Sequence, residues 1–145
     1  MSKYIQPITI DFALDVCDNL REDDRRELVE GYGLSPTEAA HEAASWSSSV
    51  GFVVPNGKTA GMAGVLPDKR IWMLCTDAIH DYPHTFAREA KRYVDSRTEM
   101  QLWNVVDKRN TVHLRLLKFL GFRFIDEVEY GPNNLPFIRF SKWDL

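Results

Sequence analysis

The sequence predicts a mixed α/β (α+β) fold, in which a mostly antiparallel sheet of about six to seven strands is flanked by about four to five helices. Three observations lead to this prediction. Short alternating or continuous apolar stretches, typical of strands, recur along the chain. Helix-initiation signals and amphipathic periodicity separate these stretches. The chain has 145 residues, of which 44% are hydrophobic, and this is a common size for one compact domain, so we expect a single domain over residues 1–145.

The first third of the chain is predicted to combine one strand with three helices. Residues 4–10 read as a strand, after which Asp11 is expected to cap a short helix. Residues 21–31 carry charges of both signs at helical spacing, which is typical of a helix exposed to solvent. A third helix is expected to begin at Ser35, because this N-cap serine is followed by a proline and then by Glu38, which completes a capping box.

The middle of the chain is predicted to form three strands and a helix. Residues 50–54 and 59–66 flank an Asn-Gly dipeptide, which readily adopts the positive φ angles of a tight hairpin turn. The unbroken apolar run at residues 71–75 is typical of a strand that is covered on both faces at the middle of a sheet. Apolar side chains at helical spacing then predict a helix over about residues 82–97.

The last third is predicted to add a strand, a short helix and a closing hairpin. Residues 100–106 read as the strand, and residues 122–128 and 136–140 as the hairpin. The helix begins at about Asn110, and Gly121 is expected to end it in a left-handed conformation. Its apolar face is expected to contain Val112, Leu116, Phe119 and Leu120, widened by His113 and Leu117.

Composition narrows the class of protein. The formal net charge of -3 leaves no basic excess to neutralise phosphates, so sequence-specific nucleic-acid binding is not expected. Cys17 and Cys75 form no paired spacing of a zinc site or a disulfide framework, which fits a reducing cytoplasm. The N-terminus lacks the apolar segment of a secretion signal, and no stretch approaches the roughly 18 apolar residues of a membrane span.

The segment from Asn110 to Phe122 resembles the last conserved motif of the GNAT superfamily of N-acetyltransferases, commonly Asn-x-x-Ala-x-x-Leu-Tyr-x-x-Leu-Gly-Phe. The order of the predicted elements is also that of the GNAT fold. Two positions depart from the motif, because His113 replaces its small Ala and Leu117 replaces the Tyr that often protonates the departing thiolate. The matching residues are Asn110, Leu116, Leu120, Gly121 and Phe122.

The resemblance implies an acetyl-CoA site between two splayed strands, with the pyrophosphate held by a loop that is usually Gln/Arg-x-x-Gly-x-Gly/Ala. Backbone amides surround a phosphate only where no side chain blocks their approach. The equivalent residues 75–84 contain two aspartates and a proline but no glycine, so we do not expect ordinary cofactor binding. If CoA binds, its expected contacts are Cys75, Thr76 and Asn110.

Acetyl transfer also requires a base that takes a proton from the attacking amine. If the protein is active, Asp107 and His113 are the candidate catalytic residues, and a hydrogen-bonded core role is the alternative for His113. The loop before the fourth predicted helix contains possible metal ligands, but a proline interrupts their helical spacing. We therefore expect surface histidines and helix caps there rather than a metal site. These possible ligands are Cys75, Asp77, His80, Asp81 and His84.

A closer resemblance covers about the last third of the chain. Leu102-Trp103-Asn104, followed by Asn110-Thr111 and His113, is similar to the internal virion protein A-like family of short-tailed phages, a small GNAT-like family. This resemblance implies a phage protein without efficient acetyl transfer and without a cofactor. It would act through contacts with phage structural or host proteins in virion assembly or genome ejection, in the host cytoplasm, with or without association with the virion. The alternative is an active acetyl-CoA-dependent N-acetyltransferase acting on a protein or small-molecule amine.

Overall fold

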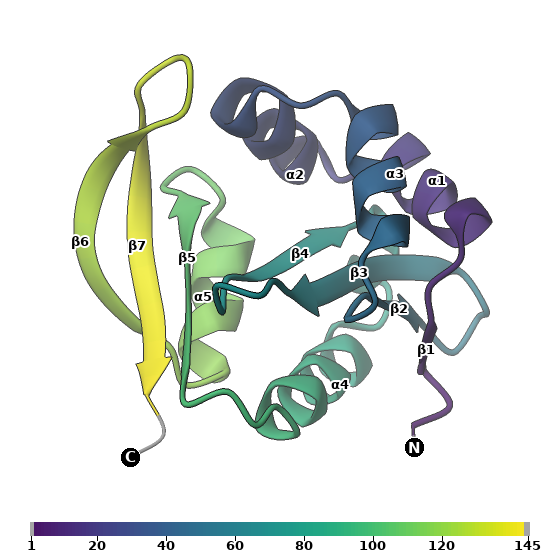
Figure 1. Cartoon of the computed structure of the whole chain (residues 1–145). Helices are drawn as coiled ribbons and strands as arrows, with labels where there is room; N and C mark the ends of the chain where they lie inside the picture. Colours follow the sequence, from purple (N-terminus) through teal and green to yellow (C-terminus); the bar gives the residue numbers. More distant parts are fainter. Residues whose placement is uncertain (1, 144–145) are drawn as a thin grey trace.

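Seven strands form two antiparallel sheets that meet along one seam in the computed structural model, which describes residues 2–143 (Figure 1). The first sheet has the order β1-β2-β3-β4 and the second has the order β5-β7-β6. The seam lies between β4 and β5, which an isolated parallel bridge joins. The strands are β1 (Ile5–Pro7), β2 (Val50–Val53), β3 (Thr59–Val65), β4 (Ile71–Cys75), β5 (Gln101–Asp107), β6 (Arg123–Tyr130) and β7 (Leu135–Trp143). The predicted mixed, mostly antiparallel sheet flanked by helices is confirmed.

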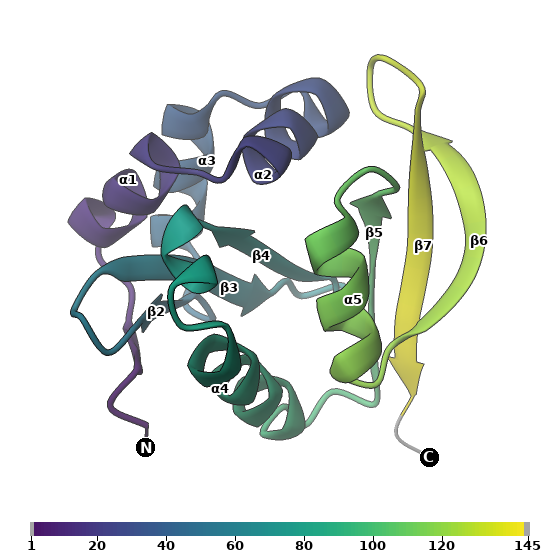
Figure 2. The same ribbon diagram turned by 180° about the vertical axis from the view of Figure 1, so that it is seen from behind.

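Helices cover both faces of the sheets. Figure 2 shows α4 and α5 on one face, and α3 lies over the strands on the opposite face in Figure 1. The helices are α1 (Ile10–Asp18), α2 (Glu22–Arg26), α3 (Pro36–Ser45), α4 (Pro83–Asp95) and α5 (Thr111–Phe119), with a π-helical turn η1 (Glu27–Tyr32) and a 3-10 turn η2 (Asp77–His80). None of the helices in the described part of the chain has the length and apolar character needed to cross a bilayer.

Two apolar clusters result from this arrangement, one on each face. Val16 of α1 and Ala40 of α3 pack with Met62 in the first cluster. Ala63, the next residue along β3, belongs to the second cluster, which includes Phe86 of α4. Successive side chains of a strand point to opposite faces, so β3 contributes to both clusters. The strand therefore fixes the separation between the two helical layers.

The helix starts agree with the sequence in part. The capping box of α3 is confirmed, since Ser35 and Glu38 each accept a hydrogen bond from the backbone N–H of the other. The prediction that Asp11 caps the first helix is wrong, because the strand ends earlier than expected. The Thr9 hydroxyl accepts from the N–H of Phe12 at 3.1 Å and caps α1 instead.

The prediction of a solvent-exposed helix over residues 21–31 is also wrong in its essential feature. Arg21, Asp24 and Glu27 are only 4%, 0% and 6% exposed. They are spaced three positions apart, so they share one face of the α2–η1 segment, and that face points into the seam between the sheets. Burial of these groups is possible because Arg21 and Asp24 form an ion pair there and Glu27 accepts a backbone N–H.

The remaining elements form close to their predicted limits. The hairpin of β2 and β3 turns at Gly57, whose φ is 84°, and Gly121 ends α5 with a φ of 92°. β4 forms as predicted, but it is the last strand of its sheet and borders the seam. The placement of Phe119 in the core is wrong, because its side chain is 54% exposed, whereas Leu117 and Leu120 are buried.

Candidate functional site

The seam between β4 and β5 has a tight end and an open end. At the tight end, Arg70 and Trp103 form the parallel bridge, and the Asn104 side-chain amide donates to the Ile71 carbonyl at 2.8 Å. Beyond these residues the two strands diverge toward Cys75 and Asp107, as Figure 1 shows. Backbone groups at the open end therefore need partners other than the neighbouring strand.

The α2–η1 segment supplies those partners. Arg21 donates its backbone N–H to the Cys75 carbonyl at 3.0 Å, and Asp24 accepts the Cys75 N–H at 2.6 Å. On the other side of the opening, Glu27 accepts the Asp107 N–H at 2.5 Å. One segment of the same chain thus occupies the strand edges on both sides of the opening.

Asp24 is the centre of this arrangement. Its carboxylate accepts hydrogen bonds from the Arg21 guanidinium at 2.7 Å and from the Asn110 amide at 3.0 Å. His113 Nε2 lies 3.4 Å from the other carboxylate oxygen. Arg21 also donates from Nε to His80 at 3.0 Å. These contacts pair the buried charges, and removal of one partner would leave an uncompensated charge in the interior.

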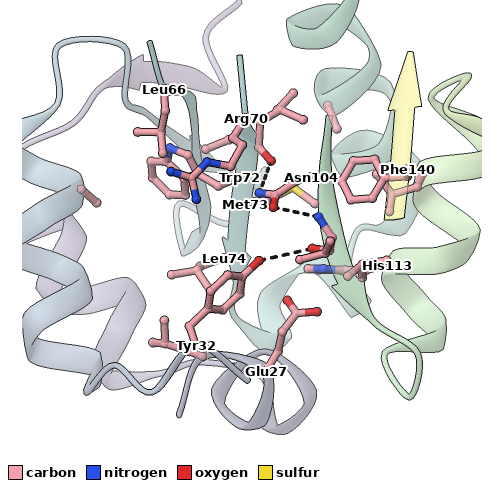
Figure 3. Close-up of a pocket in the computed structure, with 18 of the residues that line it drawn as sticks. Glu27, Tyr32, Leu66, Arg70, Trp72, Met73, Leu74, Asn104, His113 and Phe140 are labelled. Atoms are coloured by element: carbon pink, nitrogen blue, oxygen red, sulfur yellow. Dashed lines mark hydrogen bonds between the residues drawn. The ribbon is translucent and has the colours of Figure 1, made fainter. Parts of the chain in front are cut away.

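A pocket of about 290 Å³ lies along the seam beside this network. Figure 3 shows its wall, where Glu27 and Tyr32 project from one side and His113 from the other. The Tyr32 hydroxyl donates to the Val105 carbonyl at 3.2 Å, which fixes the ring against β5. The rest of the wall is mostly apolar, with Trp72 and Leu74 of β4 among its residues. Such a pocket can hold a small organic group whose polar atoms face the titratable side chains.

Burial shifts the pKa values of two groups in the pocket, Glu27 and His113, in favour of their neutral forms. Burial raises the pKa of Glu27 to about 8, and the nearby carboxylates of Asp24 and Asp107 add to this effect. Burial also lowers the pKa of the His113 imidazole, while the Asp24 carboxylate opposes that shift. Near neutral pH the pocket therefore presents a carboxylic acid and a neutral imidazole.

The predicted catalytic residues lie in different surroundings. His113 lines the pocket, and its Nε2 has no hydrogen-bond partner among the described residues. Asp107 is buried and its carboxylate accepts two hydrogen bonds from the Arg109 guanidinium, at 2.8 and 3.0 Å. Burial alone would raise the pKa of Asp107, but the Arg109 contacts outweigh it and hold the pKa below its ordinary value. Asp107 is thus poorly suited to take a proton from an amine.

The predicted cofactor contacts lie around the open end of the seam. Cys75 and Asn110 both bind Asp24, as described above, and Asn110 is fully buried. The Thr76 hydroxyl donates to the Thr59 carbonyl at 2.8 Å and caps η2 by accepting the Ala78 N–H. Each of these polar groups thus already has a partner within the protein.

Several backbone N–H groups of the loop after β4 are already bonded within the protein. The backbone N–H groups of Thr76, Ile79 and Asp81 donate to carbonyl oxygens of the protein, and the N–H of Ala78 donates to a side chain. The exposed carboxylate of Asp77 would also repel a phosphate. This loop therefore differs from the usual CoA loop in having no glycine and in using these four amides internally.

Asp24, Cys75 and His113 bring three potential metal ligands within 4.8 Å of one another. This group differs from the predicted loop cluster, of which it contains only Cys75. The Arg21 guanidinium contacts the Asp24 carboxylate and opposes a second cation there. Burial raises the pKa of the Cys75 thiol well above its ordinary value, so the thiolate that a metal requires is disfavoured. The network is better explained by internal pairing of charge.

Sequence reasoning missed Arg21, Asp24 and Glu27. A signal was present, because their spacing of three residues places one charge per turn on a common helical face. The same spacing also occurs on solvated helices, since surface ion pairs use it. Only the position of the helix relative to β4 and β5 distinguishes the two cases.

The chain has the GNAT fold, as the comparison with solved structures shows. A GNAT-family acetyltransferase from Bacillus anthracis superposes with a TM-score of 0.69 at 9% identity, covering 96% of this chain and 93% of that chain. One from Bacillus cereus gives 0.66 at 13% identity, covering 100% and 99%. The aminoglycoside acetyltransferase AAC(6')-Ib, in complex with coenzyme A, gives 0.62 at 14% identity, covering 97% and 94%. No protein-family model and no curated protein sequence matches the chain.

Proposed function

We propose that this chain is a bacteriophage protein that keeps the GNAT fold without efficient acetyl transfer, and that it acts through protein contacts in virion assembly or genome ejection. The partners would be phage structural proteins or host proteins. The proposal rests on the observation that side chains of the protein itself occupy the opening of the seam. Asp24 and Glu27 bind the strand edges on either side of it.

The occupied opening argues against efficient cofactor binding on energetic grounds. A ligand that entered between the ends of β4 and β5 would have to displace Asp24 from the Cys75 N–H and from Arg21. Breaking a buried ion pair by removing one partner costs about 3–5 kcal/mol. That cost would be subtracted from the binding energy of the cofactor, because the same backbone groups cannot bind both.

The phage assignment is supported by the residues that carry the resemblance to the internal virion protein A-like family. Asn104 ties β5 to β4, and Asn110 and His113 surround Asp24. One of the two departures from the GNAT motif, His113, therefore lies against Asp24 in the closed seam, beside the matching residue Asn110. Leu117, at the position of the motif's Tyr, is buried and supplies no proton donor. These features fit a family in which the fold has been kept for a purpose other than acetyl transfer.

Isothermal titration calorimetry with acetyl-CoA tests the proposal. We expect no detectable binding of the full chain at millimolar acetyl-CoA, with AAC(6')-Ib as a positive control because its structure holds coenzyme A. Micromolar binding would overturn the proposal. In infected cells we expect the protein to purify with phage structural components, and recovery of the free protein alone would contradict the assembly role.

The second candidate function is acetyl-CoA-dependent N-acetylation of a protein or small-molecule amine. Two observations favour it: the structural neighbours are acetyltransferases, and the pocket contains Glu27 with a pKa of about 8. A carboxyl with such a pKa is protonated at neutral pH, but it supplies a substantial fraction of carboxylate, which can act as a general base, as the pH approaches 8. In this case Glu27 and His113 are better placed than Asp107 to accept a proton. The same calorimetry decides between the two functions, since this one requires the cofactor to bind.

A further inference from the structure

We propose that the face of the β5-β7-β6 sheet opposite α5 is a docking surface for an acidic protein segment that carries apolar side chains. The inference rests on the proposed function, because it names the chemistry of the partner. The surface is separate from the Asp24 network, and it is hollowed into a groove of about 480 Å³. The groove is lined by Asp68, Lys69, Gln101, Trp103, Ile125, Arg139, Phe140 and Ser141.

Strand register defines which side chains share this face. Trp103 of β5 is paired with Ser141 of β7, which is paired with Arg123 of β6. Directly paired residues lie on the same side of a sheet, so these three form one row across it. Leu102 and Val106, which alternate with Trp103 along β5, belong instead to the core beneath α4 and α5. η1 covers the end of the open face near Val105, through Tyr32, and the groove lies at the other end.

The groove contains two apolar contact sites. The Trp103 indole N–H donates to the Asp68 carbonyl at 2.9 Å, and the Arg70 guanidinium lies 6.0 Å from the ring centroid. These contacts hold the ring in place before any partner arrives. Ile125 lies at the register shift of β6, where its side chain is 53% exposed. A fixed tryptophan and an exposed isoleucine together could form a binding hot spot, because a few side chains supply most of the binding energy of an interface.

The charge around the groove is positive although the protein is acidic overall. Arg139 and Arg70 are paired with Asp126 and Asp68, respectively. Among the described residues that line or border the groove, the remaining charges are the two cations Lys69 and Arg123. Lys69 and Arg123 form no ion pair with any of the described residues. A local excess of positive charge on a chain of net charge -3 would attract and orient an acidic partner.

These features favour an acidic segment over a second copy of the chain. In a symmetric dimer through this face, Lys69 and Arg123 would approach their own copies, and like charges at a contact are unfavourable. They also favour a protein over a nucleic acid, since Asp68 lines the groove and Asp126 pairs with the lining residue Arg139, and these carboxylates would repel a phosphate backbone.

Fluorescence anisotropy with two labelled peptides tests the surface on the full chain. One peptide alternates Glu and Leu, and the other alternates Lys and Leu at the same length. We expect the Glu/Leu peptide to bind, and Lys69→Glu with Arg123→Glu to weaken it by about tenfold or more. A matched pair, Lys58→Glu with Arg115→Glu, makes the same charge change at exposed positions elsewhere and should alter the affinity by less than about twofold.

Four outcomes would overturn the docking surface. They are equal binding of the Lys/Leu peptide, an unchanged affinity in the Lys69→Glu and Arg123→Glu variant, tighter binding of a single-stranded oligonucleotide, and a dimer in sedimentation experiments that this variant abolishes. A separate measurement distinguishes failure of the docking surface from failure of the proposed function. If this variant still purifies with phage structural components, the surface is refuted and the assembly role remains. If the unmodified protein purifies with none, the assembly role itself fails.

Discussion

The two ends of the β4–β5 seam are held by different chemistry. At the tight end, backbone and neutral side-chain groups join the strands, with Asn104 donating to the Ile71 carbonyl. At the open end, ionised side chains of a third segment fill the gap, with Asp24 and Arg21 at its centre. The first end resembles an ordinary sheet edge. The second uses side chains where the sheet has no neighbouring strand.

This difference has a consequence for stability and for function. Neutral hydrogen bonds each contribute about 1 kcal/mol, whereas a buried charge that loses its partner costs several times more. The open end should therefore be sensitive to single substitutions and to pH, and the tight end should be less so. The sensitive end is also the place where a GNAT cofactor would enter, so the internal contacts and the proposed loss of acetyl transfer share one location.

The largest expected effect is that of Asp24→Asn. The substitution keeps the size of the side chain but leaves the Arg21 guanidinium, which is 5% exposed, with only the more distant carboxylate of Asp23 at 3.6 Å. We expect the free energy of unfolding to fall by about 4 kcal/mol, as measured by urea denaturation. Glu22→Gln, at an exposed ion pair of the same helix, should change it by less than about 0.5 kcal/mol. Equal losses of unfolding free energy in the two variants would show that the buried ion pair at the open end is no more important for stability than an exposed one.

A pH dependence is expected from Glu27. Its pKa rises from an ordinary 4.5 to about 8, so the folded protein binds its proton more tightly than the unfolded chain does. Stability is therefore highest below pH 4.5 for this group and falls as pH rises to about 8, by roughly 3 kcal/mol between pH 5 and pH 8. Glu27→Gln keeps an oxygen that can accept the Asp107 N–H and carries no charge, so it should remove this loss.

Urea unfolding at several pH values measures the difference between the unmodified protein and Glu27→Gln. The two should have similar stability near pH 5, and the variant should be the more stable at pH 8. Glu30→Gln, on the exposed side of η1, serves as the control and should leave the pH dependence unchanged. Parallel pH profiles for all three proteins would contradict the raised pKa of Glu27.

Much of the fold could be predicted from the sequence, because its signals are local. The Ser35–Glu38 capping box, the Asn-Gly turn and the stop at Gly121 depend on residues within a few positions of one another. The exposed position of Phe119 could not be predicted, since helical periodicity gives a wide apolar arc but not the direction in which the sheet lies. Tertiary packing decides which part of that arc is covered.

The site was less predictable, because its contacts connect distant segments. Asn110 and His113 belong to the recognised motif, yet their partner Asp24 lies 86 positions from Asn110 in the sequence. A dense run of charge such as residues 21–31 gives no indication that one of its faces enters a seam. The resemblance to a GNAT motif predicted the fold, while the position of His113 beside Asp24 could be found only from the structure.

The smallest of the three effects should come from Asn104→Ala at the tight end. This substitution removes the bond to the Ile71 carbonyl and the bond that the Asn104 side chain accepts from the Val105 N–H. Two neutral hydrogen bonds predict a loss of about 2 kcal/mol in the free energy of unfolding, because no charge is left unpaired. Gln101→Ala on the same strand, which removes no side-chain hydrogen bond within the described residues, is the matched control. The opposite outcome is that Asn104→Ala and Asp24→Asn lower the free energy of unfolding by the same amount. That result would contradict the difference between the two ends of the seam, because the open end would then be no more sensitive to substitution than the tight end.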